Sequence, residues 1–446
     1  MHQRGGETER MSVTTPSPAQ PRRPQPSPPA APPTARVGSA RRRATGASLG
    51  PLPVTNVVVL EVGLAVGLLL LAVSTSLWPA SAAVLLVALV VAFTRWKGRW
   101  LTQWTKLTLG YAARSHTRVA HPPARADDEE VQLDDKPVTG PEDARVSLLR
   151  LALPDLVVAQ GTDHERGQVG LAMHDGTWTA VLLVEPPPAL VTHVGAAPNL
   201  PLGALTPCLE DRGVILDSIK VIWHCYPGSA ALPPNSPALN SYLEVLGPLP
   251  AAARRTTWVA VRLDPRRCQQ AITERGGGVV GAHRALIGAL SRIRSALERH
   301  GVSTRPLDVD EVLRSGISAA NLQSVAGANK KVGLRERWTG VTAGGVGHAS
   351  YAITRWPGKG GMRNINALTG VRALSSTVTL SISPSEEDGK VGLRGLVRVS
   401  ARTPSELEAA DGKLNTLGEK LDITLTPLRG LQVAGLAATL PLGGSA

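Results

Sequence analysis

The chain has 446 residues, a formal net charge of +13 and three cysteines. A chain of this length holds two or three domains by the usual domain size. The cysteines are odd in number and lack metal-ligand spacing, which argues against a disulfide framework and a cysteine-based metal site. The charge is uneven, with +12 in residues 1–125 and −6 in residues 126–145. Such basicity beside an apolar run favours an anionic membrane surface over nucleic acid as a partner.

The first segment, residues 1–50, is rich in proline and arginine and has almost no bulky apolar side chain. Such a composition cannot bury enough surface to offset the entropy of ordering, so it predicts a disordered, basic, Pro-rich tail. The cluster at residues 24–29 is also compatible with docking into an aromatic groove. A solvated tail that helps to fix the membrane topology is the simpler interpretation.

Residues 51–94 hold a long apolar run that is broken by a polar stretch at residues 74–79. A bilayer core needs roughly 20 apolar residues of helix, so the run is long enough to cross twice. We predict a two-helix transmembrane hairpin with spans at residues 54–73 and 80–93. Basic residues flank both outer ends and none lies in the turn, which predicts a multi-pass plasma-membrane protein with both termini in the cytoplasm.

A cleavable signal sequence is the competing interpretation of this run, because Ala80-Ser81-Ala82 resembles a cleavage site. A tail of some 50 residues precedes the run, however, and a second span follows at once, so even a cleaved chain would stay anchored. Glu61 is the one charged side chain inside the run. A carboxylate there costs about 2.5–3.5 kcal/mol, so Glu61 is predicted either to reach the cytoplasmic headgroups or to contact a neighbouring subunit.

Residues 95–145 are predicted to form a juxtamembrane amphipathic helix followed by an acidic linker. Three tryptophans recur every four residues with basic residues between them, which places the indoles on one helical face. This pattern is typical of a helix that leaves the bilayer through the headgroups. The predicted membrane-interface residues are Arg95, Trp96, Lys97, Arg99, Trp100 and Trp104. The same face also suits contact with a neighbouring membrane protein. The acid run at 127–135 lacks spaced ligands, which favours a solvated linker over a metal site.

Two further halves, residues 146–326 and 327–446, each show the pattern β-β-α-β-β-α-β. Without the leading strand this is the βαββαβ order of a ferredoxin-like unit. We therefore predict an α/β (α+β) cytosolic region of two open sheets, with helices on one face. The strands are expected at 168–173, 177–184, 219–223, 257–263, 304–307, 332–338, 349–356, 376–383, 393–401 and 423–425, and the longer helices at 279–300 and 404–421.

No motif in these halves indicates a specific chemistry. Glycines 276, 278 and 281 have G-x-G-x-x-G spacing, but the strand and the acidic residue that dinucleotide binding requires are missing. The stretch Gly358-Lys359-Gly360 lacks the rest of a P-loop. His224 and Cys225 are neighbours in a strand and point to opposite faces, which disfavours a catalytic pair. We predict no catalytic residue, no cofactor and no metal ligand.

The two adjacent spans and the block of residues 254–268, which continues through 275–286 to 305–308, resemble EccE. EccE is a membrane component of type VII (ESX) secretion systems in actinobacteria. The resemblance covers roughly residues 50–320 and is less distinctive after residue 330. It implies a structural, non-enzymatic subunit that packs against the other Ecc membrane proteins, including an FtsK/SpoIIIE-type ATPase, with membrane lipids as further partners.

Two other functions stay open at this point. One is a membrane-tethered, glycosyltransferase-like transferase at the inner leaflet, for which paired acids around a metal-nucleotide would be the distinguishing feature. The sequence offers no such pair clearly. The other is a basic adaptor for anionic lipid or for peptidoglycan-synthesis proteins. The secreted substrates and the stoichiometry of any complex cannot be read from the sequence.

Overall fold

The structure is a computed structural model. It describes residues 48–49, 52–96, 99–120, 143–186, 200–226, 254–326, 331–358, 361–385 and 391–444. The predictions for the basic tail up to residue 47 and for the acidic linker at 121–142 lie outside these residues.

Two apolar helices, α1 (Val54–Val73) and α2 (Trp78–Phe93), follow the short pair β1 (Ser48–Leu49) and β2 (Leu52–Pro53). A 3-10 turn, Thr75–Leu77, joins them, and Pro79 stands in the first turn of α2, where a missing N–H costs nothing. The segments Val54–Val73 and Thr75–Phe93, the second of which includes the 3-10 turn, are each long and apolar enough to cross a membrane. The second helix begins two residues before its predicted start, and the first matches its prediction.

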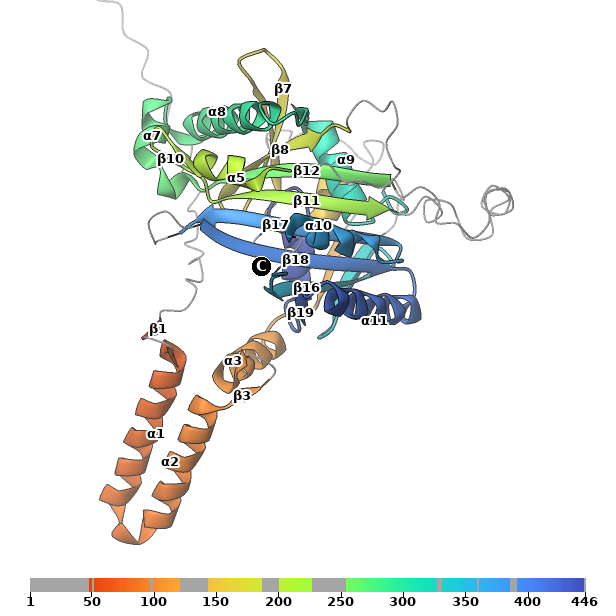
Figure 1. The fold of residues 1–446 in the computed structure, drawn as a ribbon. Helices are drawn as coiled ribbons and strands as arrows, with labels where there is room; N and C mark the ends of the chain where they lie inside the picture. The colour runs from red at the N-terminus through yellow and green to blue at the C-terminus, as the bar shows by residue number, and fades with distance from the viewer. Residues whose placement is uncertain are drawn as a thin grey trace, which may run out of the picture. The chain divides into compact units, whose positions relative to one another are not determined.

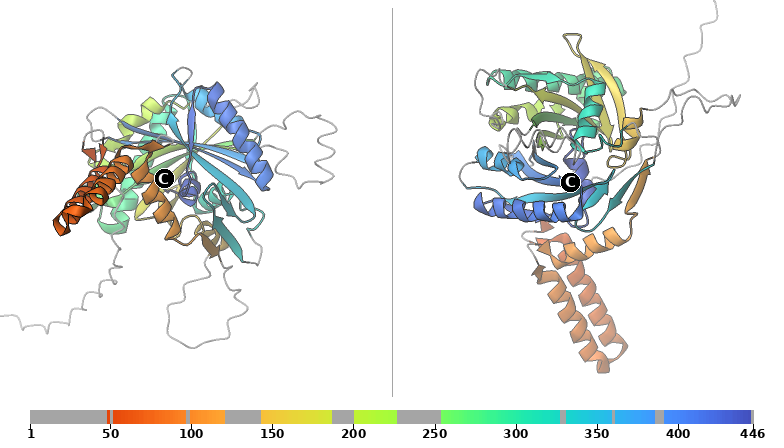
Figure 2. Two further views of the ribbon diagram at one scale, coloured as in Figure 1. Left: turned by 90° about the horizontal axis from the view of Figure 1, so that it is seen from below. Right: turned by 90° about the vertical axis from the view of Figure 1, so that its right-hand side faces the viewer.

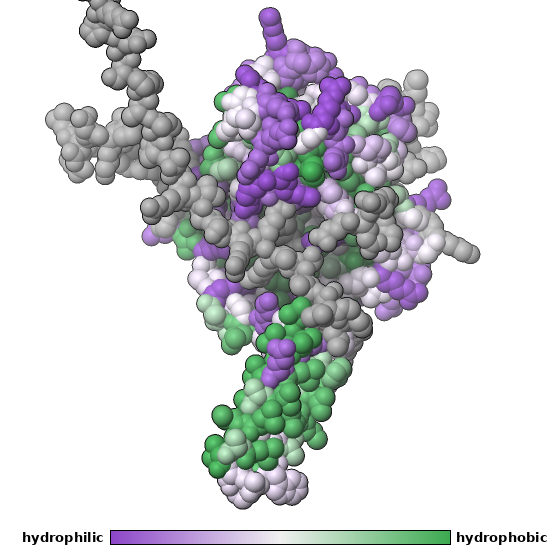
Figure 3. All heavy atoms as spheres, turned by 90° about the vertical axis from the view of Figure 1, so that its left-hand side faces the viewer, coloured by the Kyte–Doolittle hydropathy of each residue, from purple (hydrophilic) through white to green (hydrophobic). Residues whose placement is uncertain are grey.

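Small residues let α1 and α2 pack closely. A Cβ added at Gly63 would lie 2.4 Å from the Cβ of Ala88. The Ser81 hydroxyl donates to the Gly67 carbonyl at 2.9 Å. The outer surfaces of both helices carry exposed apolar side chains such as Leu69, which is 64% exposed. Figure 3 shows this surface as a hydrophobic (green) zone. The hairpin therefore has a small-residue seam inside and an apolar exterior.

The segment after α2 differs from the prediction of one continuous helix. Two short strands, β3 (Arg95–Trp96) and β4 (Arg99–Trp100), form a hairpin before α3 (Leu101–Ala112) begins. Trp96 and Trp100 therefore do not lie on a helix with Trp104, and the prediction that the three indoles share a helical face is wrong.

The remaining strands form one large antiparallel sheet (Figures 1 and 2). Its order is β5-β14-β15-β16-β18-β17-β11-β12-β8-β7-β6, with β13 added to β8 and β19 added to β16. The strands are β5 (Thr117–Ala120), β6 (Val157–Thr162), β7 (Gln168–His174), β8 (Thr177–Val184), β11 (Ser218–Tyr226), β12 (Arg254–Leu263), β13 (Thr304–Pro306), β14 (Val332–Glu336), β15 (Val341–Ala343), β16 (Val346–Arg355), β17 (Ser375–Pro384), β18 (Val391–Ala401) and β19 (Thr424–Pro427). The small pair β9 (Glu210–Asp211) and β10 (Val214–Ile215) stands apart from this sheet.

The sheet joins the two halves through β11 and β17, which pair from Ile219↔Ile382 to Cys225↔Ser376. The prediction of two separate open sheets is therefore wrong. The physical reason is that each of these strands would otherwise be an edge with unpaired backbone groups. The two halves repeat one pairing order, β13-β8-β12-β11 in the first and β19-β16-β18-β17 in the second.

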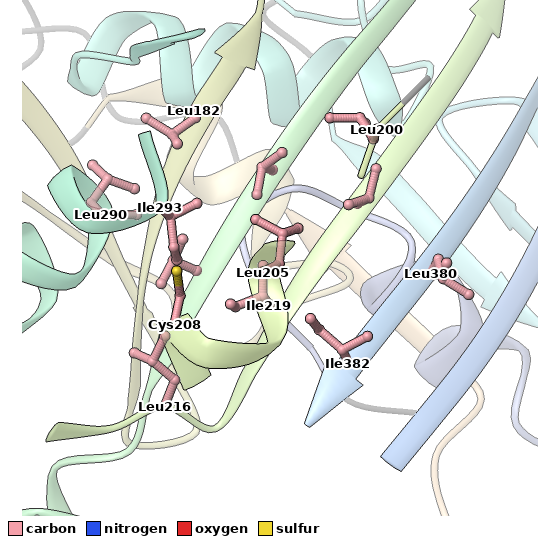
Figure 4. Packing of buried hydrophobic residues seen from close by; sticks show 14 of the residues in the cluster. Leu182, Leu200, Leu205, Cys208, Leu216, Ile219, Leu290, Ile293, Leu380 and Ile382 are labelled. Atoms are coloured by element: carbon pink, nitrogen blue, oxygen red, sulfur yellow. The ribbon is translucent and has the colours of Figure 1, made fainter. Parts of the chain in front are cut away.

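Helices cover both faces of the sheet, so the prediction of helices on one face is also wrong. One core cluster packs the sheet against α5 (Leu202–Leu205), α8 (Gly278–Glu298), α10 (Gly361–Ala367) and α11 (Pro404–Lys420). Figure 4 shows Leu205, Ile219, Leu290 and Ile293 from this cluster. The other cluster packs it against α4 (Ala144–Leu149), α9 (Val309–Ala319) and α12 (Gln432–Ala438). The helix α7 (Gln269–Glu274) precedes α8.

Strand alternation explains the two faces. Val221 packs in the first cluster and its neighbour Ile222 in the second, as do Val259 and Trp258. Successive side chains of a strand point to opposite faces, so a central strand covered on both sides reads as a continuous apolar run. Helix ends follow local rules as well, because Asp308 and Thr403 form capping boxes with Glu311 and Glu406 at the starts of α9 and α11.

Candidate functional site: the junction between the juxtamembrane helix and the sheet

Helix α3 is bound to the hairpin by a buried polar contact. The Asn56 side chain on α1 is fully buried and donates from Nδ2 to the Ala92 carbonyl on α2 at 2.7 Å. The Thr102 hydroxyl on α3 donates to Asn56 Oδ1 at 2.5 Å. One amide side chain thus joins three helices. Because a buried amide without partners is costly, this contact specifies how α3 leaves the hairpin.

The opposite end of α3 is bound to the sheet by aromatic rings. The Trp338 ring, just after β14, lies 6.2 Å from the Trp104 ring and 5.1 Å from the Tyr111 ring, the latter in an edge-to-face arrangement. The Tyr111 ring also stacks on His116, with ring centroids 4.0 Å apart. Aromatic pairs of this kind are worth about 0.5–1.5 kcal/mol beyond the area that they bury.

An ion pair completes the junction. Arg114 Nη2 lies 2.8 Å from Glu336 Oε2, and the same nitrogen donates to the Gly430 carbonyl. Glu336 is buried at the end of β14, and its second oxygen accepts from the Val433 N–H of α12 at 3.0 Å. Gly430 has φ +67°, and a Cβ there would lie 2.5 Å from the Trp338 ring, so the turn requires glycine.

After this ion pair, the chain enters the sheet directly. Strand β5 pairs with β14 from Arg335↔Thr117 to Val332↔Ala120, and the Glu336 N–H donates to the His116 carbonyl at 2.7 Å. The juxtamembrane segment is therefore an edge of the sheet as well as a neighbour of the hairpin. We call the set Asn56, Thr102, Trp104, Tyr111, Arg114, Glu336 and Trp338 the junction.

A cleft of about 210 Å³ opens beside the junction, lined among others by Arg114, Arg262, Asp175 and Glu336. It is smaller than the roughly 300–1,000 Å³ of pockets that enclose drug-sized ligands. Its charges are largely matched internally, because Arg114 pairs with Glu336 and Arg262 Nη1 lies 3.3 Å from Asp217 Oδ2. The cleft therefore offers no distinctive ligand chemistry.

The membrane-interface residues predicted from the sequence divide among these elements. Arg95, Trp96, Arg99 and Trp100 lie in β3 and β4, Trp104 lies in α3, and Lys97 lies outside the described residues. Trp104 is half-buried against the sheet. Their interfacial role stays a prediction. Glu61 is exposed on α1, off the seam that α1 shares with α2.

Polar residues in the sheet region serve local structure. Asp264 accepts from the Arg266 N–H at 3.1 Å and caps a 3-10 turn, and Asp308 caps α9. His283 lies edge-to-face on Trp178, with ring centroids 4.3 Å apart. Burial raises the pKa of the Cys225 thiol. Within the part of the chain that the structure describes, no group of three or more His, Cys, Asp or Glu side chains is arranged to hold a metal ion.

Comparison with known proteins finds one family that resembles part of the chain. Residues 251–353 match the family model described as "Putative type VII ESX secretion system translocon, EccE". The chain is 41% identical over 64 residues to the ESX-1 secretion system protein EccE1 of Mycolicibacterium smegmatis, and 39% identical over 64 residues to the protein of that name from Mycobacterium tuberculosis. Residues 251–353 are thus similar to the EccE family of type VII secretion proteins.

The alignments with the relatives each cover 14% of this chain and 14% of the relative. The segment that matches the EccE model begins later than the resemblance seen in the sequence and continues past residue 330. It runs from the start of β12 through α8 and α9 into β16, so it spans both halves of the sheet. It includes Glu336 and Trp338, which form the sheet side of the junction. These comparisons give no support to the transferase alternative.

Proposed function

We propose that this protein is a structural membrane subunit of a type VII (ESX-like) secretion complex, which it anchors and stabilises without catalysis of its own. The observation that carries the proposal is the two-sided attachment of α3. Thr102 joins the start of α3 to Asn56 of the hairpin, and Trp104, Tyr111 and the following Arg114 join α3 and its C-terminal extension to the sheet. A subunit that transmits position from a membrane anchor to a folded region needs such a fixed connection.

Partner binding is assigned by this proposal to two surfaces. The hairpin exterior is apolar and suits lipids and the transmembrane helices of other Ecc membrane proteins. The sheet region carries the segment matched by the family model and would contact the FtsK/SpoIIIE-type ATPase and the other subunits. The proposal also retains two units of ferredoxin-like order, one in each half, and no nucleic-acid partner.

The topology in the proposal has both termini in the cytoplasm and the turn between α1 and α2 outside. Its support is the basic flanks of the hairpin and the two apolar helices. Cysteine-accessibility labelling in intact cells tests it. A cysteine at Ser76 should be labelled by a membrane-impermeant reagent, and a cysteine at Ser12 should not. Labelling at Ser12 would contradict this topology.

Glu61 tests whether the hairpin contacts partner subunits. Its exposed position on α1 leaves both sequence-based interpretations available, the headgroups or a polar group of a neighbour. If it contacts a neighbour, Glu61→Gln and Glu61→Leu should both weaken the co-purification of partner subunits from native membranes. If both variants co-purify partners normally, the side chain only reaches the headgroups.

The scaffold function itself is tested by comparing two tryptophans. Trp338→Ala removes the ring that holds α3, whereas Trp356→Ala removes another half-buried ring, which packs on the first core cluster. Affinity purification from native membranes with mass spectrometry should show partners lost in Trp338→Ala and retained in Trp356→Ala at matched protein levels. Equal loss in both variants, or no loss in either, would argue against a function carried by the junction.

A further inference from the structure

A row of polar side chains crosses the centre of the sheet where the two halves meet. It lies on the face that α4, α9 and α12 cover. His224 on β11 is opposite Thr377 on β17, Thr377 is opposite Arg398 on β18, and Arg398 is opposite Ser350 on β16. His348 lies two residues before Ser350 on the same strand. All five side chains are buried, and Arg398, Thr377, Ser350 and His348 are 0% exposed. We call them the central polar cluster.

Arg398 brings a positive charge into this cluster, and no carboxylate of the described residues pairs with it. Its Nη2 donates to the Ala319 carbonyl and, at 3.1 Å, to the Thr377 hydroxyl. Its Nε and Nη1 are buried and have no hydrogen-bond partner among the described residues. Burial lowers the pKa of Arg398 to about 9, which still leaves the guanidinium charged at neutral pH. A buried charge without a counterion is strongly unfavourable.

The hydrogen bonds of His224 leave one more donor without a partner. Since the Thr377 oxygen accepts from Arg398, its hydroxyl hydrogen is available to donate to His224 Nδ1, which lies 2.9 Å away. When Thr377 donates this hydrogen, Nδ1 is the acceptor of a neutral imidazole and the proton is on Nε2. His224 Nε2 is buried without a partner among the described residues.

The same hydrogen-bond argument applies to His348. The Ser400 hydroxyl accepts from Asn321 Nδ2 at 3.3 Å and lies 2.9 Å from His348 Nδ1. When the serine hydrogen goes to Nδ1, the imidazole proton is on Nε2, again buried and without a partner among the described residues. In these tautomers Arg398 and the two histidines present four unpartnered N–H-bearing nitrogens, and the unpartnered oxygens of neighbouring residues include Asn321 Oδ1, Ser350 Oγ and Thr379 Oγ1.

The C-terminal end of α9 offsets part of the charge. Ala319 is the last residue of α9, and a helix C-terminus carries roughly half a negative charge. The remaining positive charge and the excess of donors require an acceptor. Water brings two donors of its own into a cluster that already has too many donors. An anion accepts only.

We propose that the central polar cluster binds one small monovalent anion, with chloride as the probe. The anion would balance Arg398 and accept hydrogen bonds from its unpartnered Nε and Nη1 and from a neighbouring histidine ring nitrogen. It would stabilise the contact between the two halves, since these residues come from β11 of the first half and from β16 and β18 of the second.

Thermal unfolding of the full-length protein in detergent tests this proposal. The protein is compared in sodium chloride, sodium bromide and sodium gluconate at equal ionic strength and pH. An ion that binds the folded state alone raises the unfolding temperature with its concentration. The unfolding temperature should therefore rise with chloride or bromide and not with gluconate. Equal unfolding temperatures in the three salts would overturn the proposal and leave ordered water in the cluster.

Two variants separate the buried cluster from the basic surface, because a chain of net charge +13 also attracts anions generally. Arg398→Met removes the buried charge, and Arg394→Met removes an exposed arginine four residues earlier on the same strand. The halide effect should disappear in Arg398→Met and persist in Arg394→Met. An effect that persists in Arg398→Met, or disappears in Arg394→Met, would overturn the proposal. If Arg398→Met does not fold, the double variant His224→Gln/His348→Gln takes its place, and a halide effect of wild-type size in it would overturn the proposal.

Discussion

Arg114 and Glu336 are 222 positions apart in the chain, and their side chains meet at 2.8 Å between Nη2 and Oε2. Their environments differ, since the side chain of Glu336 is 3% exposed and that of Arg114 is 37% exposed. If the ion pair breaks, water can solvate the Arg114 guanidinium, whereas the buried Glu336 carboxylate loses its counterion. The pair closes the junction at the point where the juxtamembrane segment becomes an edge strand of the sheet.

Arg114→Gln should loosen the junction, because it leaves the buried Glu336 carboxylate with the Val433 N–H as its remaining hydrogen-bond donor. An unsatisfied buried polar group costs about 1–3 kcal/mol, and a charged one more. Limited proteolysis of the protein in detergent should then cut between α3 and β5 faster than in wild type. Arg335→Gln, an exposed change on the same strand as Glu336, is the matched control and should be cut at the wild-type rate. Equal rates in all three proteins would contradict this role of the ion pair.

Asn56→Leu should release α3 from the hairpin without preventing the two spans from forming. The variant removes the donor to the Ala92 carbonyl and the acceptor of the Thr102 hydroxyl. Chemical crosslinking between cysteines placed at positions 57 and 105 should become slower in Asn56→Leu than in the parent pair. Asn56→Gln, which keeps an amide, should fall between them. An unchanged crosslinking rate in Asn56→Leu would show that packing alone holds the three helices.

Trp258→Ala should be strongly destabilising. Trp258 is 4% exposed in the second core cluster, and removal of a buried tryptophan costs about 3–5 kcal/mol. Denaturant unfolding of the protein in detergent, followed by circular dichroism, measures the loss, and the complex should be depleted in cells. Val280→Ala, at a 55% exposed position on α8, should change the free energy of unfolding by less than about 0.5 kcal/mol. Similar losses for both changes would refute the placement of Trp258.

Acid should destabilise the protein through His224 and His348. Burial, with Arg398 second, lowers the pKa of His224 to about 3 and that of His348 well below its usual value. Both pKa values are below that of an unfolded histidine, about 6.5, so the unfolded state binds more protons as the pH falls. The stabilisation is complete above about pH 6.5 and is lost as the pH falls toward the folded pKa, by at most about 1.4 kcal/mol per pH unit for each histidine.

Thermal unfolding between pH 7.5 and pH 5, values chosen around the unfolded pKa, measures this effect. The double variant His224→Gln/His348→Gln should lose less stability over this range than the wild type. His164→Gln, whose side chain is 68% exposed, should keep the wild-type slope. Parallel curves for the wild type and the double variant would rule out these two histidines as the cause.

If the chain performed chemistry, acids in the matched family segment would be the residues to suspect. Asp264 and Asp308 instead accept backbone N–H groups as caps. Asp264→Asn and Asp308→Asn keep a capping oxygen and remove the charge. Secretion by cells that carry either variant should stay near the wild-type level at equal protein amount. Loss of secretion with a fully assembled complex would point to chemistry at that position and against the scaffold.

Much of the sheet could be predicted because its central strands are continuous apolar runs with turn residues between them. The hairpin of β7 and β8 about Asp175-Gly176 is an example, and so is the capped helix α11. The joining of β11 to β17 could not be predicted, because the pairing of strands far apart in the chain leaves no local pattern. The helix α12 was missed because it is short and lacks a clear apolar period.

The junction was only partly accessible from the sequence. Trp104 could be named from the recurring tryptophans, but that spacing suggested a helix across residues that form β3 and β4. The burial of Glu336, by contrast, could have been predicted from the alternation of residues in its strand. Val332, Leu334 and Glu336 alternate as the buried positions of β14, and an acid at such a position predicts a cationic partner. The identity of that partner, Arg114, depends on the pairing of β5 with β14 and is not encoded locally.

The seven residue pairs between β11 and β17 also determine how the chain can be divided. A break in the connection between Ala326 and Lys331 would separate the halves and expose a long strand edge on each. Free edges of this kind recruit other strands, so either half produced alone should aggregate. Produced together, the two fragments should find each other and restore the sheet. The protein is thus a natural candidate for a split reporter, whose signal would depend on the co-expression of both fragments.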